Sequence, residues 1–382
     1  MPSILYLCEY GSVNGGENSL LTLLPYVKAA GFDVSVASPE TGLLAERLAE
    51  IGIRHIPFSC WKDCGERFSL DENRSRLGSL LQAHAPDILH SNSLSMSRLS
   101  GPVLRELNDG SESQMTGIGH LRDIIKLNRQ VITDLNEQTQ LIAVSQATLD
   151  FHVAQGLDAK KCVVLHNGVD QTKFFPALQD SANSKASLHQ ELQLAPEKQL
   201  IGWVGQLGAR KGLDVLVEAA KIVVPKFPQA HFIVCGTRHS VKDEAIAYVN
   251  DAYEEIKESG LSDSFSFLEH RPDIDQLMRQ WCMLVHTAKQ EPLGRVLLEA
   301  AASGLPVVAT QVGGTAEIFP NEEAILVEPH QPAQTAESIL QLLRSDELRH
   351  SYSEKVLARS HYFAIDSIAE SFVSLYQTAV KE

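Results

Sequence analysis

The chain has 382 residues, of which 44% are hydrophobic and 21% are charged, a composition typical of globular proteins and not of disordered or fibrous ones. This length favours two domains, because a single hydrophobic core rarely grows beyond roughly 250–300 residues. The formal net charge of −15 argues against nucleic acid as a general partner, and no apolar run approaches the ~20 residues that cross a bilayer.

The first half of the chain alternates short apolar runs with longer helical patterns. The N-terminal sequence MPSILYLCEYG lacks a basic segment and turns acidic after its apolar run, so it predicts a first buried strand and not a signal peptide. Helices are predicted at 17–31 and 42–52, each ending at a Gly that can serve as a C-cap. Strands are predicted at 4–8, 33–38, 87–92, 117–121 and 141–145.

The loop after the first strand, EYGSVNGGENSL at 9–20, leads into the first predicted helix. Gly15 and Gly16 would let this loop approach a ligand closely, and Glu17 or Asn18 could cap the helix. The loop lacks the Gly-x-Gly-x-x-Gly pattern of dinucleotide-binding proteins and the Gly-Lys-Ser/Thr of a P-loop, so neither kind of site is supported.

The predicted strand at 117–121 carries His120 near its end, where the side chain could face a ligand, although a lone histidine is more often structural. Arg122, Lys126 and Arg129 follow at helical spacing. These cations could meet an anionic acceptor or a lipid headgroup, which would bring the protein into peripheral contact with the inner face of the membrane. A solvent-exposed helix face is the simpler interpretation.

The alternation of strands and helices starts again in the second half, with strands predicted at 199–207, 231–236, 264–269, 283–288, 306–310 and 324–328. Such alternation implies parallel sheets covered by helices on both faces. We therefore predict an α/β fold of two doubly wound parallel-sheet domains, with a boundary near Asn167. Ligands bind outside the carboxyl ends of the strands in such sheets, and we expect these ends to face a shared cleft.

The segment GWVGQLGARKGLDVLVEAA at 202–220 places two cations where a strand ends and before a helix begins. Arg210 and Lys211 could neutralise a diphosphate there, as the departure of a nucleoside diphosphate requires. A turn with two solvated cations is the alternative.

The segment MLVHTAKQEPLGRVLLEAAASG at 283–304 predicts a buried strand, a loop that contains Glu291, and a helix that starts near Gly294. The free backbone N–H groups of Leu293, Gly294 and Arg295, together with the helix dipole, would form an anion site suited to phosphate. Glu299, about a turn and a half further on, could accept hydrogen bonds from sugar or ribose hydroxyls. The alternative is a Glu291 that compensates the helix dipole and a Glu299 at the surface.

Motifs for other chemistries are missing from the sequence. There is no His-Glu-x-x-His or Gly-x-Ser-x-Gly pattern, and we expect no metal and no other cofactor. The cysteines at positions 8, 60, 64, 162, 235 and 282 include no Cys-x-x-Cys pair. Reduced, mostly buried thiols in a cytoplasmic protein are the expected state.

Together these motifs resemble the family-four retaining glycosyltransferases. The resemblance spans most of the chain and rests on Gly15-Gly16, His120, HNGVD at 166–170, VGQLGARKGLDVLVEA at 204–219, and EPLGRVLLEAAASGLPVVAT followed by Gly-Gly within 291–314. It implies the GT-B fold of two Rossmann-like domains: an acceptor-binding domain at 1–167, a nucleotide-sugar-binding domain at 168–360, and a helix at 361–382 that crosses back to the first domain.

The resemblance also implies residue roles in the second domain. Glu291 would hold hydroxyls of the donor sugar, Glu299 the ribose hydroxyls, and Arg210 and Lys211 the diphosphate. The segment Leu293, Gly294 and Arg295 would bind the sugar or the diphosphate through its amides. Arg271 would border the base pocket. Gln206 also belongs to the donor-binding set, although similar enzymes often carry an Arg there, which leaves Arg210 and Lys211 as the main counter-ions.

In the first domain the resemblance implies that Gly15 and Gly16 approach the donor and that His120 contacts the sugar near the reacting carbon. The candidate catalytic set is therefore His120, Arg210, Lys211 and Glu291.

The function that the resemblance implies is retaining, metal-independent glycosyl transfer of the hexosyltransferase type, in glycan, polysaccharide or glycolipid synthesis. The donor would be a UDP- or GDP-sugar, and the acceptor a hydroxyl of a sugar, a lipid-linked or a small molecule. Two alternatives remain on the same fold. A nucleotide-sugar epimerase would need further acid/base residues and no acceptor, and a non-catalytic sugar-nucleotide-binding protein would bind without turnover.

Overall fold

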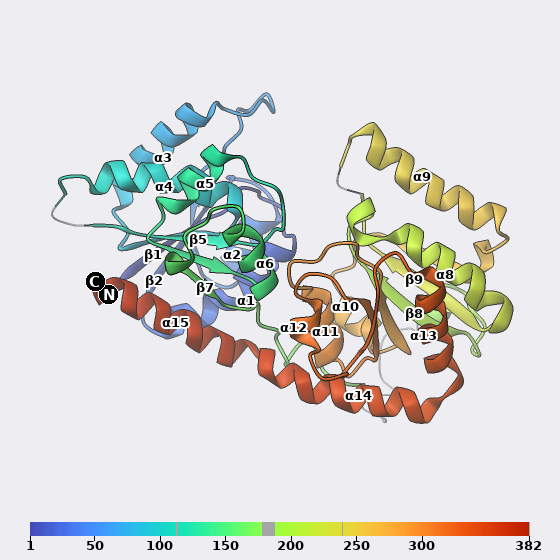
Figure 1. Cartoon of the computed structure of the whole chain (residues 1–382). Coiled ribbons are helices and arrows are strands. Elements are labelled where there is room, and N and C mark those ends of the chain that lie inside the picture. The colour runs from blue at the N-terminus through green and yellow to red at the C-terminus, as the bar shows by residue number, and fades with distance from the viewer. Residues whose placement is uncertain (112–113, 178–187, 239, 382) are drawn as a thin grey trace. The chain divides into compact units, whose positions relative to one another are not determined.

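The computed structural model describes residues 1–111, 114–177, 188–238 and 240–381. The chain divides into two compact units (Figure 1). Unit 1 comprises Met1–Gly168 and Ile365–Glu382, and unit 2 comprises Val169–Ala364. The C-terminal helix therefore belongs to the same unit as the N-terminal half of the chain.

Unit 1 is built on a seven-stranded parallel sheet with the order β3-β2-β1-β4-β5-β6-β7. Because β1 lies between β2 and β4, the strand order reverses beside it, and the carboxyl ends of β1, β4 and β5 share one edge of the sheet. The strands are β1 Ser3–Leu7, β2 Asp33–Ser38, β3 Arg54–Pro57, β4 Ile88–Ser91, β5 Thr116–Leu121, β6 Gln140–Ala143 and β7 Cys162–Val164.

The helices of unit 1 are α1 Gly15–Ala29, α2 Leu43–Glu50, α3 Leu70–His84, α4 Leu94–Asn108, α5 Arg129–Asn136, α6 Gln146–Val153 and α15 Ile365–Lys381, with the 3-10 turn η1 Ala159–Lys161. The two helices predicted at 17–31 and 42–52 are confirmed as α1 and α2. Gly31 and Gly52 follow their ends with φ of +94° and +63°, the left-handed conformation that a C-capping glycine adopts. The N-cap of α1 is Asn14 and not Glu17 or Asn18, because the helix begins at Gly15, two residues earlier than predicted. Glu17 still takes part in the cap, since its carboxylate accepts from the backbone N–H of Asn14 at 3.0 Å.

Side chains of β1 alternate between two cores, one on each face of the sheet. Ile4 and Tyr6 pack into the cluster that includes Phe372 and Tyr376 of α15, whereas Leu5 and Leu7 pack into the cluster on the other face. Phe372 and Tyr376 are almost fully buried, which makes α15 part of the core of unit 1.

Unit 2 is built on a six-stranded parallel sheet with the order β10-β9-β8-β11-β12-β13. Its first strand, β8, again lies between two neighbours and marks the point where the order reverses. The strands are β8 Gln199–Val204, β9 Ala230–Cys235, β10 Phe265–Leu268, β11 Met283–His286, β12 Val307–Thr310 and β13 Ile325–Val327. The predicted α/β class with two doubly wound parallel sheets is confirmed.

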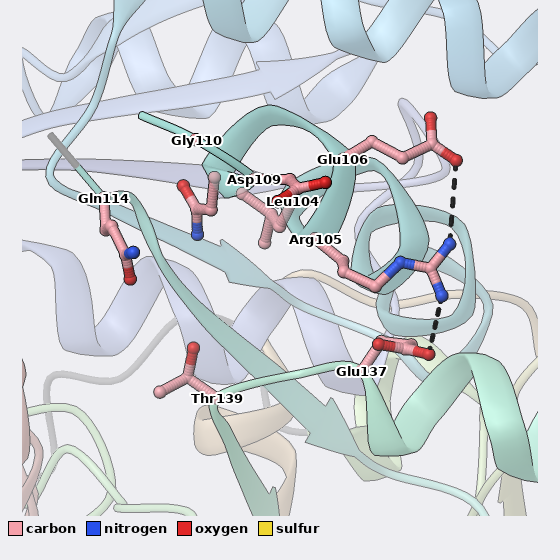
Figure 2. A pocket seen from close by; sticks show the side chains of 9 residues that line it. Leu104, Arg105, Glu106, Asp109, Gly110, Gln114, Glu137 and Thr139 are labelled. Atoms are coloured by element: carbon pink, nitrogen blue, oxygen red, sulfur yellow. Dashed lines mark hydrogen bonds and ion pairs between the residues drawn. The ribbon is translucent and has the colours of Figure 1, made fainter. Parts of the chain in front are cut away.

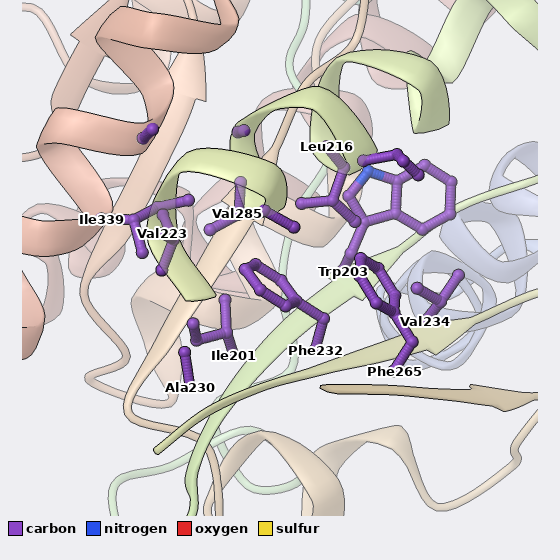
Figure 3. Packing of buried hydrophobic residues seen from close by; sticks show 14 of the residues in the cluster. Ile201, Trp203, Leu216, Val223, Ala230, Phe232, Val234, Phe265, Val285 and Ile339 are labelled. Atoms are coloured by element: carbon purple, nitrogen blue, oxygen red, sulfur yellow. The ribbon is translucent and has the colours of Figure 1, made fainter. Parts of the chain in front are cut away.

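The helices of unit 2 are α7 Leu188–Glu191, α8 Leu213–Lys226, α9 Asp243–Glu258, α10 Ile274–Met278, α11 Arg295–Ala302, α12 Thr315–Ile318, α13 Pro332–Arg344 and α14 Asp346–Ser360. The 3-10 turns are η2 Ala209–Lys211, η3 Ser262–Ser264 and η4 His361–Phe363. Figure 3 shows the main core of the unit, where Trp203 and Phe232 of the sheet meet Leu216 and Val223 of α8 and Ile339 of α13. This packing fixes the helix that follows β8.

Within the described ranges, no helix has both the length and the apolar character needed to span a membrane. All six cysteines are free thiols: Cys8, Cys60 and Cys235 are buried, Cys162 and Cys282 are half-buried, and Cys64 is exposed.

Candidate functional site

Two loops of unit 2 lie side by side because the strands that precede them are neighbours. β8 pairs with β11 in parallel, with Ile201 opposite Met283, so the loops at their carboxyl ends share one edge of the sheet. The loop after β8 carries Arg210 and Lys211, and the loop after β11 carries Glu291. A backbone hydrogen bond joins them, since the N–H of Lys289 donates to the carbonyl oxygen of Arg210 at 2.8 Å.

Gly212 makes this close approach possible. Its φ is +71°, and an added Cβ would lie 2.0 Å from the carbonyl oxygen of Thr287, so no other residue fits without moving the backbone. The Thr287 hydroxyl also holds the two loops together. It donates to the Gly212 carbonyl at 2.7 Å and accepts from the indole N–H of Trp203 at 3.0 Å. The loop that carries Glu291 is therefore tied to the strand and turn of its neighbour.

Lys211, His286 and Glu291 form a buried charged cluster at this edge. The Lys211 ammonium is ion-paired with Glu291 Oε2, and His286 Nε2 lies 3.0 Å from the same oxygen. Glu291 is 6% exposed and His286 is 3% exposed. The backbone of Glu291 is held as well, because its carbonyl oxygen accepts from the N–H of Gly314 at 3.0 Å. The predicted cation and carboxylate thus meet directly.

The cluster holds Glu291 ionised. Burial alone would raise the pKa of its carboxyl, but the Lys211 charge and the His286 hydrogen bond outweigh burial and keep the pKa well below the ordinary value. Burial lowers the pKa of His286, which makes the imidazole neutral near pH 7, with Nε2–H donating to Glu291. One negative and one positive charge are therefore present in the cluster at neutral pH.

The helix after this loop begins as predicted. Gly294 is the N-cap of α11 with φ of +105°, a conformation that favours glycine. Glu299, 8% exposed, accepts from the Nε of Arg295 one turn earlier at 2.8 Å. The alternative of a surface Glu299 is therefore wrong, and so is that of a Glu291 that serves only as a dipole counter-charge.

The structure does not bring every predicted donor-binding residue of unit 2 into this cluster. Gln206 and Arg210 are exposed, and within the described part of the chain the Arg210 guanidinium donates a hydrogen bond only to the carbonyl oxygen of Gln290, at 3.4 Å. Leu293 is buried, so only its backbone is open to a ligand role. Arg271 follows β10, at the far side of the sheet, and pairs with Glu191 at 2.5 Å and with Asp273 at 2.8 Å.

In unit 1, Gly15 and Gly16 are the first residues of α1. An added Cβ at Gly15 would meet nothing within 4 Å, whereas one at Gly16 would lie 3.3 Å from Cδ of Arg122. His120 lies on β5 and is 1% exposed. Its Nδ1 lies 3.2 Å from both His90 Nε2 and Arg122 Nη2, and its Nε2 is buried without a partner among the described residues.

The predicted helical spacing of Arg122, Lys126 and Arg129 is wrong. Residues 122–128 are not helical, and α5 begins only at Arg129. The Arg122 guanidinium donates to Asn92 at 3.0 Å and to Asn167 at 2.9 Å in addition to its contact with His120. It is thus bound among polar groups of unit 1 and is not part of an exposed helix face.

Sequence reasoning missed His286, His90 and Arg122 as members of these clusters. His286 closes the strand five residues before Glu291, and that spacing was a usable signal. His90 gave none, because its partners come from β5 and α15. Arg122 gave none, because Asn92 and Asn167 lie 30 and 45 residues away in the sequence.

A pocket of about 660 Å³ in unit 1 lies away from these residues (Figure 2). It is formed by the end of α4 and by the segments that precede β5 and β6, and Arg105 spans it to reach Glu137 at 2.9 Å. These segments meet the amino ends of the strands, so the pocket lies at the edge of the sheet opposite the carboxyl ends.

Two family models match the chain over nearly its whole length. "Glycosyltransferase Family 4" matches residues 13–173, and "Glycosyl transferases group 1" matches residues 184–359. The chain belongs to the family-four glycosyltransferases. The Lys211–Glu291 cluster lies in the part that matches the second model, and His120 lies in the part that matches the first.

Curated relatives in this family are 27% and 28% identical to the chain over the aligned regions. The D-inositol 3-phosphate glycosyltransferase of Corynebacterium urealyticum is 28% identical over 233 residues, which are 59% of this chain and 54% of that protein. The lipopolysaccharide core biosynthesis mannosyltransferase LpsB of Rhizobium meliloti is 27% identical over 274 residues, 68% of this chain and 76% of that protein. The match thus spans little more than half the length of the D-inositol 3-phosphate enzyme.

Solved structures of glycosyltransferases share the GT-B fold of this chain. HepE of Anabaena in complex with UDP-glucose superposes with a TM-score of 0.83 at 22% identity, covering 98% of this chain and 99% of that one. Sucrose-phosphate synthase of Thermosynechococcus elongatus superposes with a TM-score of 0.79 at 17% identity, covering 99% of both chains.

Proposed function

We propose that this chain transfers a sugar from a nucleoside diphosphate donor to an acceptor hydroxyl with retention of the anomeric configuration. The observation that carries the proposal is the buried Lys211–Glu291 ion pair, which lies where the strands β8 and β11 end and just before the N-terminus of α11. A fixed carboxylate, a cation and free helix amides are the groups that bind sugar hydroxyls and a diphosphate.

Glu291 would hold the donor sugar through the oxygen that the protein leaves open. Lys211 and His286 both contact Oε2, and Oε1 accepts no hydrogen bond from the described residues. An ionised carboxylate accepts strong hydrogen bonds, so Oε1 is suited to a sugar hydroxyl. Because Oε2 is held by two partners, Oε1 points in one direction before the sugar arrives, which lowers the entropic cost of binding.

The diphosphate would be bound by Lys211, by the exposed Arg210 and by the backbone N–H groups at the start of α11. Charge develops on the leaving phosphate oxygen in the transition state, and fixed donors and cations stabilise it there more than in the ground state. Glu299 would accept hydrogen bonds from the ribose, and Gln206 and Arg271 remain candidates for contacts with the nucleotide.

Retention is proposed to follow from attack on the same face from which the diphosphate departs. The carbon–oxygen bond to the diphosphate breaks, the acceptor oxygen bonds to the anomeric carbon, and the leaving phosphate oxygen takes the proton of the acceptor hydroxyl. Glu291 is tied to Lys211 and His286 and is therefore proposed as a binding group and not as a nucleophile. In this scheme Lys211 and Arg210 supply the positive charge, and no metal is required.

The relatives support the choice of donor and acceptor. HepE was solved in complex with UDP and with UDP-glucose, and LpsB is a mannosyltransferase of lipopolysaccharide core biosynthesis. We therefore propose a UDP- or GDP-sugar as donor and a sugar, lipid-linked or small-molecule hydroxyl as acceptor.

The proposal is tested with a panel of nucleotide sugars. The donor raises the melting temperature of the protein, as any ligand specific for the folded state does. With that donor and a mixture of acceptors, free nucleoside diphosphate appears only when an acceptor is present, and proton NMR of the product shows the anomeric configuration of the donor. Glu291→Gln slows transfer, whereas Glu218→Gln, an exposed carboxylate of the same unit, does not.

Other outcomes would contradict the proposal. Interconversion of the nucleotide sugar without an acceptor would show an epimerase, and binding of every donor without turnover would show a non-catalytic protein. An inverted product would overturn the same-face attack. Activity that EDTA abolishes and added Mg²⁺ restores would overturn metal independence.

A further inference from the structure

His120 is one member of a directed row of hydrogen bonds in unit 1. Beyond the contact between His120 Nδ1 and His90 Nε2 at 3.2 Å, the Nδ1 of His90 lies 2.7 Å from the hydroxyl of Tyr376, and that hydroxyl lies 3.0 Å from the hydroxyl of Tyr6. All four side chains are 1% exposed or less. Water therefore does not compete for these groups, and each must satisfy the others.

Both histidines in this row are neutral. Burial lowers the pKa of His90 to about 3, and it lowers the pKa of His120 well below the ordinary value; the nearby charge of Arg122 acts in the same direction on both. Burial also lowers the pKa of the Arg122 guanidinium, to about 10, so Arg122 stays charged near pH 7. Each imidazole then has one N–H and one lone pair, and the row can run in either of two directions.

Arg122 selects one of these directions. A guanidinium only donates, so the Nδ1 of His120, 3.2 Å from Arg122 Nη2, must accept, and the ring proton of His120 must lie on Nε2. The Nε2 of His90 faces the same lone pair and must donate to it. The Nδ1 of His90 is then an acceptor for the hydroxyl of Tyr376, which accepts in turn from Tyr6.

Without Arg122 the opposite order would satisfy the same groups. His120 Nδ1–H would donate to His90 Nε2, His90 Nδ1–H to Tyr376, and Tyr376 to Tyr6. The Nε2 of His120 would then carry a lone pair and could act as a base. At Nε2, one tautomer of His120 thus offers a ligand a hydrogen-bond donor and the other offers an acceptor. The charged guanidinium of Arg122 determines which tautomer is favoured.

We propose that Arg122 is a positioning residue that locks His120 as the Nε2–H tautomer, so that His120 binds a ligand oxygen as a hydrogen-bond donor and does not act as a base. The Nε2 atom is buried without a partner among the described residues, and a buried donor of this kind calls for an acceptor. The assignment of this hydrogen-bond acceptor to an oxygen of the nucleotide sugar rests on the proposed function, whereas the assignment of the tautomer does not.

The tautomer is measured on the ligand-free protein, without reference to activity. Long-range proton–nitrogen NMR spectra of protein labelled with ¹⁵N-histidine distinguish a protonated ring nitrogen from an unprotonated one, and His120→Gln and His90→Gln assign the signals. We expect the wild type to show protonated Nε2 and unprotonated Nδ1 for both rings. Arg122→Met is expected to move His120 toward the Nδ1–H form or to an average of the two.

Tyr6→Phe is the matched control. It removes a buried hydroxyl from the far end of the same row but leaves Arg122 in place, so both histidines keep their tautomers. A wild-type His120 with its proton on Nδ1, or on both nitrogens, overturns the inference even if Arg122→Met does not fold. An unchanged tautomer in folded Arg122→Met overturns it as well.

Activity separates this inference from the proposed function. Where transfer is measured, Arg122→Met lowers kcat about 100-fold, the scale of losing one fixed hydrogen-bond donor, while Tyr6→Phe stays near the wild type. A wild type that shows the expected tautomers but transfers no sugar supports the locked array and refutes the proposed function alone.

Discussion

Glu291 keeps its negative charge although its side chain is only 6% exposed. A carboxylate moved out of water becomes more basic, and the shift is opposed here by a full positive charge on Lys211 and by the Nε2–H of His286 on the same oxygen. The ion pair therefore does more than add stability to the fold. Without the charge of Lys211, the Glu291 carboxylate would not stay ionised in a loop that is shielded from water.

This dependence predicts a strong energetic coupling between Lys211 and Glu291. Lys211→Met leaves the negative charge of Glu291 without its counter-ion, and Glu291→Gln leaves the positive charge of Lys211 without one. Either variant alone is expected to destabilise unit 2 by about 3 kcal/mol. The double variant should lose less than the sum, with a coupling of about 1–3 kcal/mol. Urea unfolding measures this in a Trp61→Phe background, because Trp203 and Trp281 both belong to unit 2 and their fluorescence then reports on that unit alone.

The control pair is Lys221 and Glu255, which lie 2.6 Å apart in the same unit with side chains 35% and 40% exposed. Exposed ion pairs contribute little, so their double-mutant cycle should show little coupling. Equal coupling in the two cycles would contradict the interpretation that burial makes the Lys211–Glu291 pair essential.

His90 predicts a loss of stability in mild acid. Its pKa is about 3 in the folded chain against 6.5 for an ordinary histidine, so between these values the unfolded chain holds a proton that the folded chain does not. The free energy of unfolding therefore falls as the pH falls below 6.5, by up to about 1.4 kcal/mol per pH unit for this group. His90→Gln cannot take up the proton, so the stability gap between wild type and variant should narrow from pH 7 toward pH 4.

Chemical denaturation at several pH values, followed by circular dichroism, measures that gap. Contributions of titrating groups that do not contact His90 are common to both proteins and cancel in the difference. A gap that stays constant or widens on acidification would contradict a neutral, buried His90.

At the scale of elements, chemistry-bearing residues at strand ends were predictable and their partners were not. Glu291, Lys211 and Gly294 stand out because a Gly-rich loop, a strand and a helix follow one another in the sequence. The pairing of Glu291 with Lys211, 80 residues apart, depends on β11 lying beside β8, which the sequence does not state. His90 and Arg122 were out of reach for the same reason.

The strands show the same division. Long apolar runs such as 199–204 and 230–235 were predictable because they are buried on both faces. β3, with the sequence RHIP, was missed because it is a short strand at the sheet edge with alternating burial and a terminal proline. Its existence follows from its neighbour β2 and not from its own composition.

Gly212 gives a prediction at the level of the loop. Gly212→Ala places a Cβ 2.0 Å from the Thr287 carbonyl oxygen at a φ of +71°, so the turn must open and the loop that carries Glu291 must move. We expect a loss of about 2–4 kcal/mol in the stability of unit 2, together with weaker donor binding. Tryptophan fluorescence in urea and the donor-induced shift in melting temperature measure the two effects.

Gly208→Ala is the matched substitution four residues earlier. Gly208 is in the extended region with φ of −170°, and an added Cβ meets nothing within 4 Å. The stability of unit 2 in Gly208→Ala should stay within about 0.5 kcal/mol of the wild-type value. If the two alanine variants behave alike, the contact between the β8 and β11 loops is not what orders the site.

At the scale of the whole molecule, the last helix in the sequence completes the first unit of the fold. Ala369, Phe372 and Tyr376 of α15 are buried in the core that also contains residues of β1 and α1, and Tyr376 is a member of the hydrogen-bonded row that leads to His120. Each large apolar side chain buried in this way contributes about 1.5–3 kcal/mol. Unit 1 therefore depends on residues that are synthesised only after unit 2 is complete.

A chain that ends at Ala364 should consequently lose the fold of unit 1 and keep that of unit 2. Limited proteolysis with mass spectrometry measures this: fragments of residues 1–168 should appear quickly, while 169–364 stays protected. A chain that ends at Ala379 retains Phe372 and Tyr376 and controls for shortening itself, so both of its units should resist cleavage. Protection of residues 1–168 without α15 would mean that the core of unit 1 closes without Phe372 and Tyr376, and that the row beside His120 does not need the C-terminal helix.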